Sequence, residues 1–499
     1  MSVLNITNNG TRWRVFEKEW LENHLGKVID HTIGDKYDVS NFSNIEYVFW
    51  RPNSDESKPH ELKWMIDLCN KLPNAKHINS PKYFLNYHAK DSAFNIWKSK
   101  NIPHPKNICF ETHDDFNRDI YFTTPFLLRL NNQCQGKNSY LINSESELNE
   151  SALKLHSDYQ TIKSFTPTTK KICVELIDVK TEDNYNTSYR VIVAGNKIIT
   201  GYARIAPPND WMVVQGKFTE SMGKDFIKYQ KRCEMICKKY EAEILECVHS
   251  LGLDLQGIDI IEDRKGNIYM LEIQPGFSCG YSDWKSQSPF YHPRSPKELV
   301  NFLIDNKEEL VKEVPMYGEY WLNKDKLFDS VFFNLKRYMD NKKQRKKLYC
   351  DIDSTINNHW ERIHRWSSNG ECNWSKAVSR EEIMKDEVLP GALEKLRELS
   401  NEYEINFLTA RNFADAYNIT KDWLDMKGFE YKSITVVKKS KDKPEFLELN
   451  GCDLFIDDLS AGQERGPSYV NLYHDTIADL DSRNINYIIF KGDWNNVNV

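Results

Sequence analysis

Two aspartates stand at a spacing that could do chemistry. Asp351 and Asp353 follow the short apolar run Leu-Tyr-Cys in the segment KKLYCDIDSTINNHW, which begins at Lys346. The run predicts a strand, and a residue directly after a parallel strand lies at the edge where open α/β sheets bind ligands. Side chains two residues apart point the same way along an extended chain, and carboxylates that close repel unless a cation binds them or one is protonated. The pair therefore predicts Mg²⁺ ligands, or a nucleophile with an acid/base partner.

Further polar groups follow in the same region. The apolar run in EINFLTARN ends in Thr409, and KSKDKPEFLEL places Lys443 at the start of a predicted helix. The run in CDLFIDDLSAG ends in Asp457 and Asp458. A nucleophile, an acid, a hydroxyl, a lysine and a second carboxylate pair form a set suited to phosphoryl transfer.

In order and spacing, DIDSTI, FLTAR, Lys443 and FIDD resemble the four motifs of the haloacid dehalogenase (HAD) phosphatases over about 346–495. The resemblance implies Asp351 as the nucleophile that forms an aspartyl-phosphate, and Asp353 as the general acid/base. It implies phosphate contacts from Thr409 and Lys443, with Lys438, Lys439 and Lys441 as open alternatives for the lysine. The implied Mg²⁺ ligands are Asp351, Asp353, Asp457 and Asp458.

Two details qualify this resemblance. Ser354 stands where the family usually has glycine, which is expected to stiffen the loop without removing chemistry. Only a short cap separates the first motif from LPGALEKLREL, so the site is expected to be fairly open. In this respect the region is similar to the nucleotidases and to the 3′-phosphatase half of phage polynucleotide kinase-phosphatase enzymes.

A second carboxylate set lies in the N-terminal part, in GIDIIEDRKGNIYMLEIQPGFS (257–278). Two predicted strands flank the turn DRKGN, with Asp259 on the first strand and Glu272 and Gln274 on the second. Glu272 and Gln274 face the same way, and cross-strand neighbours of this kind can hold Mg²⁺.

Cations and hydrogen-bond acceptors precede this pair. Arg129 lies on a predicted strand–loop–strand flap suited to covering nucleotide phosphates. Glu175 and Asp178 end another predicted strand, where they could accept hydrogen bonds from an adenine amino group and a ribose. Arg190 and Arg204 lie on adjacent strands of the hairpin signalled by Gly-Asn in VAGNKI.

This order of elements resembles an ATP-grasp domain over roughly 80–285, with similarity to ribosomal-protein-S6-glutamate-ligase-like members in 79–107. The resemblance implies ATP and Mg²⁺ as cofactors and Lys90 as an ATP phosphate contact. Arg129 and Gln274 stand where the family usually has lysine and asparagine. Arginine grips phosphate as a fork rather than as a point charge, and glutamine offers its carbonyl from a longer stem. The phosphate-loop pattern GxxxxGK[ST] is absent from the sequence.

The elements that would position these residues divide the chain near 345. The patterns predict an α/β and α+β multidomain protein in which an ATP-grasp fold is followed by a Rossmann-like, doubly wound domain with a small cap. The expected parts are an N-terminal α/β domain (1–80), the ATP-grasp domain (81–315), a helical basic linker (316–345) and the phosphatase domain (346–499).

The composition argues against a membrane as a partner and does not favour nucleic acid, which stays an open alternative. A net charge of −6 over 499 residues gives no overall attraction to nucleic acid or anionic membrane, and no apolar run approaches a membrane span. No secretory signal is recognisable at the start, so a cytoplasmic enzyme with small-molecule substrates carrying a carboxylate or a phosphate is expected.

Three functions remain open at this stage. The leading one is a two-headed enzyme, in which a ligase activates a carboxylate as an acyl phosphate for an amine-type nucleophile, and a phosphatase removes a phosphate monoester. In the ligase, Arg190 and Arg204 would stabilise charge on the transferring group. The alternatives are a small-molecule kinase paired with a phosphatase, and a nucleic-acid end-processing enzyme, which rests on the basic run KRYMDNKKQRKK (336–347).

Overall fold

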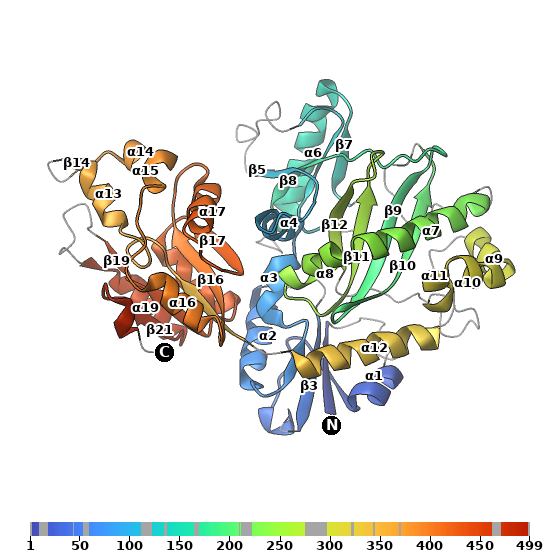
Figure 1. The fold of residues 1–499 in the computed structure, drawn as a ribbon, viewed down its shortest axis with the longest axis horizontal. Coiled ribbons are helices and arrows are strands. Elements are labelled where there is room, and N and C mark those ends of the chain that lie inside the picture. Colours follow the sequence, from blue (N-terminus) through green and yellow to red (C-terminus); the bar gives the residue numbers. More distant parts are fainter. Residues whose placement is uncertain are drawn as a thin grey trace. The chain divides into compact units, whose positions relative to one another are not determined.

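The computed structural model describes most of the chain, in two compact units, Met1–Lys342 and Lys343–Val499 (Figure 1). The described residues are 2–8, 18–42, 44–52, 59–110, 122–133, 137–163, 169–208, 210, 222–274, 297–320, 324–342, 345–368, 371–461 and 471–497.

The first unit begins with a parallel sheet in the strand order β2-β1-β3-β4. Its strands are β1 (Ser2–Thr7), β2 (Lys27–Thr32), β3 (Ile45–Arg51) and β4 (Lys76–Ile78). Almost all of β1 is buried because helices cover the sheet, as expected for parallel strands. The short helices between these strands are α1 (Lys18–Leu25), η1 (Val39–Phe42) and α2 (Pro59–Lys71).

Two antiparallel sheets follow, with strand orders β5-β8-β6-β7 and β10-β9-β11-β12. The first contains β5 (Asn107–Phe110), β6 (Phe126–Leu130), β7 (Ser139–Ile142) and β8 (Lys171–Glu175). The second contains β9 (Asn186–Ala194), β10 (Lys197–Ala206), β11 (Leu255–Glu262) and β12 (Ile268–Gln274). The predicted Gly-Asn hairpin joins β9 to β10, and Gly195 has the positive φ of 58° that such a turn requires.

Several short helices surround these sheets. The segment 79–107 contains η2 (Pro81–Tyr83), α3 (Phe84–Tyr87) and α4 (Lys90–Ser99), and α7 (Gly223–Lys239) and α8 (Glu241–Ser250) precede β11. The remaining helices are α6 (Glu145–Lys163), α9 (Lys297–Asp305), α10 (Lys307–Glu313), α11 (Pro315–Tyr320) and α12 (Lys324–Asn341).

Helix α12 corrects the expectation of a linker at 316–345. One face of α12 is buried in the core beneath β9 and against α1, so the helix is part of the first unit. Its buried apolar residues are Leu327, Phe328, Val331, Phe332, Leu335 and Met339. The basic residues at the end of α12 made its apolar stripe hard to recognise in the sequence. Lys336 forms an ion pair with Asp340, and Lys342 forms one with Asp254, both within the same unit.

The second unit is built on a parallel sheet in the order β17-β16-β13-β18-β21. The strands are β13 (Lys346–Cys350), β16 (Tyr403–Ala410), β17 (Ser433–Val437), β18 (Leu454–Asp457) and β21 (Tyr487–Ile489). The chain starts at the central strand, winds outward through β16 and β17, and returns to the other side at β18. This reversal is the doubly wound topology, and ligands bind at such a switch point beyond the carboxyl ends of the strands.

Helices and short hairpins complete the second unit. A small insertion after β13 carries α13 (His359–Arg365), the β14–β15 hairpin (Ser367–Ser368 with Glu371–Cys372), α14 (Trp374–Ala377) and α15 (Arg380–Ile383). The other elements are α16 (Ala392–Leu399), α17 (Ala416–Met426), η5 (Ser440–Asp442), α18 (Lys443–Leu449), β19 (Ser460–Ala461), β20 (Asn471–Leu472), α19 (His474–Ser482) and η7 (Trp494–Asn496).

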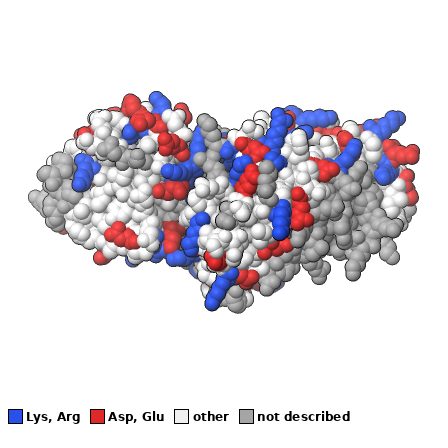
Figure 2. All heavy atoms as spheres, turned by 90° about the horizontal axis from the view of Figure 1, so that it is seen from below, with Lys and Arg blue, Asp and Glu red and all other residues white. Residues whose placement is uncertain are grey.

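The last two features of the fold concern the charged surface and the apolar character of the helices. On the face drawn in Figure 2, basic and acidic side chains are interspersed rather than gathered into a field of one sign. Among the described residues, no helix combines the length and the apolar character needed to cross a membrane.

Candidate functional site

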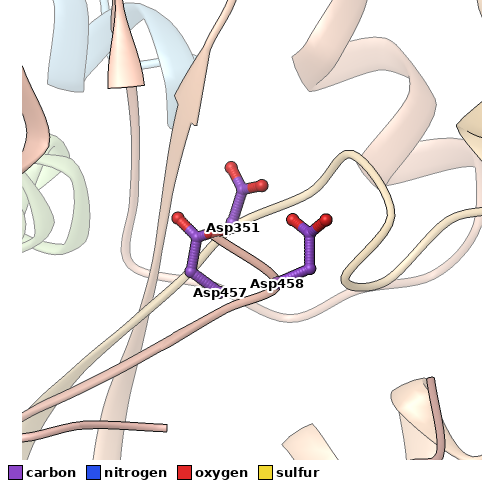
Figure 3. Close-up of side chains that lie close together, drawn as sticks. All are labelled: Asp351, Asp457 and Asp458. Carbon is purple, nitrogen blue, oxygen red and sulfur yellow. The ribbon is translucent and has the colours of Figure 1, made fainter. Parts of the chain in front are cut away.

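Three carboxylates converge at the switch point of the second unit (Figure 3). Asp351 follows β13, while Asp457 ends the neighbouring strand β18 and Asp458 comes next. One oxygen from each side chain lies within 4.8 Å of the others, which makes this the group of possible metal ligands found among the described residues. Three oxygens at this spacing suit a hard cation such as Mg²⁺. The predicted convergence of strand-end aspartates is present for these three residues.

Lys443 supplies the positive charge of this site. Its Nζ lies 2.9 Å from Oδ1 of Asp351 and 2.6 Å from Oδ2 of Asp457, and its side chain is buried. Burial would lower the pKa of Lys443, but the two carboxylates raise it above its ordinary value. The lysine is placed by the first turn of α18, which packs against α19.

The carboxylates of Asp351, Asp457 and Asp458 still repel one another despite the nearby lysine. Burial, followed by the charge of Asp457, raises the pKa of Asp351 to about 7. Burial and the charges of Asp457 and Asp351 also raise the pKa of Asp458 well above its usual range. When all three are ionised, one ammonium group leaves two negative charges uncompensated, which a divalent cation would neutralise. The residues present therefore fit Mg²⁺.

Thr409 stands at the same edge of the sheet. It is the penultimate residue of β16, the neighbour of β13, and its side chain is buried. The hydroxyl Oγ1 has no hydrogen-bond partner among the described residues. A buried hydroxyl without a partner is uncommon and can be satisfied by a ligand oxygen.

Asp353 is held apart from this cluster by an arginine. Arg411, two residues beyond Thr409, donates from Nε and Nη2 to the two oxygens of Asp353 at 2.8 and 2.7 Å. Burial alone would raise the pKa of Asp353, but Arg411 holds it well below the usual range. Asp353 is not among the three clustered metal ligands, so its expected place in the Mg²⁺ set stays a prediction.

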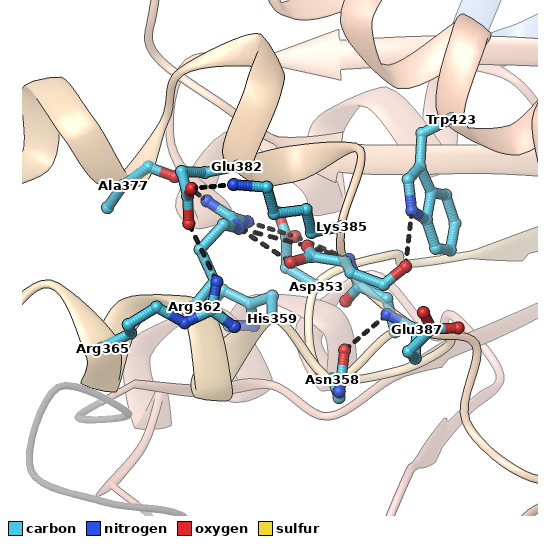
Figure 4. A network of polar contacts seen from close by, with 12 residues as sticks. Asp353, Asn358, His359, Arg362, Arg365, Ala377, Glu382, Lys385, Glu387 and Trp423 are labelled. Atoms are coloured by element: carbon cyan, nitrogen blue, oxygen red, sulfur yellow. Dashed lines mark hydrogen bonds and ion pairs between the residues drawn. The ribbon is translucent and has the colours of Figure 1, made fainter.

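A polar network behind Asp353 joins it to the small insertion (Figure 4). Asp386 accepts hydrogen bonds from Nε of Arg362 at 3.0 Å and from Nδ2 of Asn357 at 3.0 Å. Nη2 of Arg362 lies 3.7 Å from Oδ1 of Asp353, and Arg362 also donates to the carbonyl of Ala377. Burial raises the pKa of Asp386 to about 6 although Arg362 opposes this shift.

Ser354 adopts the conformation that glycine would supply. Its φ is +64°, in the left-handed region that costs a residue with a Cβ about 1 kcal/mol. Its N–H donates to Oδ1 of Asn357 at 3.1 Å, and its hydroxyl lies 2.9 Å from Nδ1 of His359. These contacts hold the left-handed backbone of Ser354 in place.

In the first unit, two arginines share one aspartate. Arg190 donates from Nε and Nη2 to the two oxygens of Asp259 at 2.6 and 2.7 Å, and Nη2 of Arg204 adds a contact at 2.9 Å. Burial would raise the pKa of Asp259, but the two arginines lower it to about 2. The strand register explains the meeting, since Asp259 of β11 stands opposite Arg190 of β9.

Glu272 is likewise paired with a cation. It stands opposite Asp259 in the β11–β12 register, and its Oε1 lies 2.9 Å from Nζ of Lys90. Lys90 also donates to the carbonyl of Gln133 at 2.9 Å, which Nη2 of Arg129 contacts at 2.8 Å. The structure thus joins Lys90, Arg129 and Glu272 across the two antiparallel sheets.

Glu175 and Asp178 are not joined to these groups by a hydrogen bond or ion pair in the described part of the chain. Glu175 accepts a hydrogen bond from the backbone N–H of Lys106 at 3.1 Å, and Asp178 pairs with Arg264 at 2.8 Å. The side chain of Gln274 lies outside the described residues, so its predicted role as a metal ligand is not addressed.

Sequence reasoning missed Arg411, Arg362 and Asp386. Arg411 carried a signal, because it stands inside FLTAR at the strand end that also supplies Thr409. Arg362 and Asp386 carried none, since they come from a helix and a connecting segment and meet only through the tertiary fold.

Comparisons with known proteins give only distant matches. No family model and no curated protein matches this sequence. One similar solved structure is N5-carboxyaminoimidazole synthetase from Staphylococcus aureus complexed with ADP, at 14% identity over 55% of this chain and 70% of that chain, with a TM-score of 0.37. Another is D-alanyl-alanine synthetase A from Vibrio cholerae, at 12% identity over 61% of this chain and 96% of that chain, with a TM-score of 0.39. A third is D-alanine–D-alanine ligase from Bacillus anthracis complexed with ATP, at 12% identity over 63% of this chain and 99% of that chain, with a TM-score of 0.36. Scores and identities this low establish neither the fold nor an activity of this chain.

Proposed function

We propose that the protein is a two-headed enzyme. The second unit would be a Mg²⁺-dependent phosphatase of the HAD type, and the first an ATP- and Mg²⁺-dependent ligase of the ATP-grasp type. The observation that carries the phosphatase is the cluster of Asp351, Asp457 and Asp458 around Lys443 at the switch point of a parallel sheet. The ligase rests on the meeting of three cations with Asp259 and Glu272.

In the phosphatase, the buried carboxylate of Asp351 attacks the phosphorus of a phosphate monoester. The ester P–O bond breaks, and the departing oxygen takes a proton from Asp353. Water then attacks the phosphorus of the aspartyl-phosphate and gives its proton back to Asp353, which frees phosphate and restores Asp351. Lys443 and Thr409 would contact the phosphoryl oxygens. Asp351, Asp457 and Asp458 would hold Mg²⁺, which would supply further charge neutralisation.

The proton transfers assigned to Asp353 require its charge to change during the cycle. Arg411 lowers the pKa of Asp353 and so keeps it ionised, which suits the step in which it accepts a proton from water. A bound phosphate monoester adds negative charge nearby, and like charge favours the protonated form of a carboxyl. Substrate binding would thereby prepare Asp353 to act as the acid in the first step.

In the ligase, the paired charges would exchange partners when the nucleotide binds. Lys90, Arg190 and Arg204 pair with the carboxylates of Asp259 and Glu272. On nucleotide binding these cations would pair with ATP phosphates, and Asp259 and Glu272 would hold Mg²⁺. An exchange of this kind leaves no buried charge unpaired at either stage. Arg129 would add a further phosphate contact from the β6–β7 flap, with Glu175 and Asp178 as the proposed adenine and ribose contacts.

The ligase reaction follows from this arrangement. A substrate carboxylate attacks the γ-phosphorus of ATP, ADP leaves, and an acyl phosphate forms. An amine then attacks the acyl carbon, loses a proton and expels phosphate, giving an amide. The arginines would stabilise the negative charge of the transferring phosphoryl group.

Two assays on the full chain test the proposal. The second unit is expected to hydrolyse p-nitrophenyl phosphate in a reaction that requires Mg²⁺ and stops when the metal is chelated. If no hydrolysis occurs at every pH tested between about 5 and 9, the proposed phosphatase is refuted. Release of ADP and phosphate that depends on both a carboxylic acid and an amine is expected for the first unit. A stable phosphoester in place of free phosphate would identify a kinase instead.

A further inference from the structure

Asp386 is a buried carboxylate that the phosphatase reaction, as proposed, does not use. It lies just after α15, and its side chain is 3% exposed. Its backbone is fixed as well, because Nε1 of Trp423 donates to the Asp386 carbonyl at 3.1 Å and the Asp386 N–H donates to Ile383. A buried charge in a rigid setting orients whatever it contacts.

Both oxygens of Asp386 are used as acceptors. Oδ1 accepts from Nε of Arg362 at 3.0 Å, and Oδ2 accepts from the same Nε at 3.2 Å and from Nδ2 of Asn357 at 3.0 Å. Arg362 and Asn357 are themselves almost fully buried. Neither donor has much room to move while Asp386 holds it.

Each of these two donors also reaches Asp353. Nη2 of Arg362 lies 3.7 Å from Oδ1 of Asp353, and Nδ2 of Asn357 lies 3.4 Å from the same oxygen. With Nε committed to Asp386 and Nη1 to the Ala377 carbonyl, Arg362 stops short of the close pairing that Arg411 makes with Asp353. Asp386 therefore governs how tightly a second arginine grips Asp353 and how its Oδ1 is oriented.

We infer that Asp386 is a positioning residue for the phosphatase reaction, acting on Asp353 through Arg362 and Asn357. The inference rests on the proposed phosphatase function. Proton transfer depends on the placement of the acid to within tenths of an ångström, so a change two contacts away affects the rate. Phosphate binding, which belongs to Asp351, Lys443 and Thr409, does not pass through Asp386.

The test uses two esters that differ in their need for an acid. p-Nitrophenolate leaves readily without a proton, whereas the alkoxide of glycerol 2-phosphate needs one in the transition state. Asp386→Asn retains one acceptor oxygen and turns the other into a donor that faces Asn357 and Arg362. The matched control is Glu382→Gln, because Glu382 is also a mostly buried carboxylate of the insertion. Among the described residues, its partners Arg365, Trp366 and Lys385 make no hydrogen bond or ion pair with Asp353.

For Asp386→Asn, kcat/KM on glycerol 2-phosphate is expected to fall by about tenfold or more, and on p-nitrophenyl phosphate by less than about threefold. The affinity for beryllofluoride with Mg²⁺, a mimic of the phosphoryl group on Asp351, should stay within about twofold of the wild type. Glu382→Gln should leave all three values unchanged.

If kcat/KM fell equally on the two esters, or if beryllofluoride binding weakened, Asp386 would support the fold only and the inference would be wrong. An unchanged kcat/KM on both esters would also overturn the inference. If Asp386→Asn fails to fold, Arg362→Lys provides the same test, because an ammonium group cannot hold Asp386, Ala377 and Asp353 together. A wild-type protein that hydrolyses neither ester would refute the proposed phosphatase itself.

Discussion

Lys443 holds its ammonium group 2.9 Å from the carboxylate of Asp351, so the buried residue that directly follows β13 faces a cation of its own chain. Lys438, Lys439 and Lys441 were open alternatives in the sequence, and none of them has an ion pair with this cluster among the described residues. Lys443 is the first residue of α18 and the three others precede it, so only Lys443 is placed by this helix beside the carboxylates.

Replacing Asp351 by Asn should abolish phosphate ester hydrolysis and leave ATP turnover intact. The amide cannot act as the nucleophile, while the first unit does not depend on this residue. The measurement is the initial rate of both activities on the same preparation. Loss of both activities would contradict the assignment of two separate sites.

Replacing Glu272 by Gln should have the opposite effect. The substitution removes a negative charge that Mg²⁺ would need and leaves Lys90 buried without its carboxylate. ADP formation is expected to drop by at least about a hundredfold, with ester hydrolysis unchanged. Wild-type ADP formation in this variant would remove Glu272 from the ligase site.

Mg²⁺ binding by the second unit should strengthen as the pH rises through about 7, because the pKa of Asp351 is raised to about 7 from an ordinary value of 3.8. Below that pH a proton must leave before the cation binds, so calorimetry in two buffers of different ionisation enthalpy should detect proton release. A Mg²⁺ affinity that does not change between about pH 6 and 8 would contradict this.

The same raised pKa affects the stability of the metal-free protein. Because the folded chain keeps the Asp351 proton up to a higher pH than the unfolded chain, the stabilising contribution is complete below about 4 and is lost as the pH rises to about 7. Saturating Mg²⁺ should remove this loss. Thermal unfolding with and without Mg²⁺ across this range measures both effects.

Replacing Lys443 by Met should destabilise the second unit by about 3–5 kcal/mol in the absence of metal, because buried carboxylates then lack their cation. Mg²⁺ should restore more stability to this variant than to the wild type. Lys439→Met, at an exposed neighbouring lysine, is the matched control and should behave as the wild type. A melting temperature equal to that of the wild type without metal would show that Lys443 does not neutralise the cluster.

The sequence alone determined which residues end the central strands of the second unit. Apolar runs that stop at Asp351, Thr409 and Asp457 predict parallel strands, and parallel strands place their carboxyl ends at one edge of the sheet. The convergence of these side chains therefore required no knowledge of distant contacts. The hairpin at Gly195 was predictable for a similar reason, since a local turn sets its register.

The tertiary structure decided what each charged group contacts. Asp259 could be read as a metal ligand from its strand, but its pairing with Arg190 and Arg204 depends on the register of three strands. The contacts of Asp386 with Arg362 depend on how α13 packs against the segment that follows α15 within the insertion. Helix α12 packs into the first unit because its apolar stripe meets a surface that only the assembled sheets create. Local patterns fix strands and turns, whereas ion pairs and interfaces join segments that are far apart in the sequence, and no local rule specifies them.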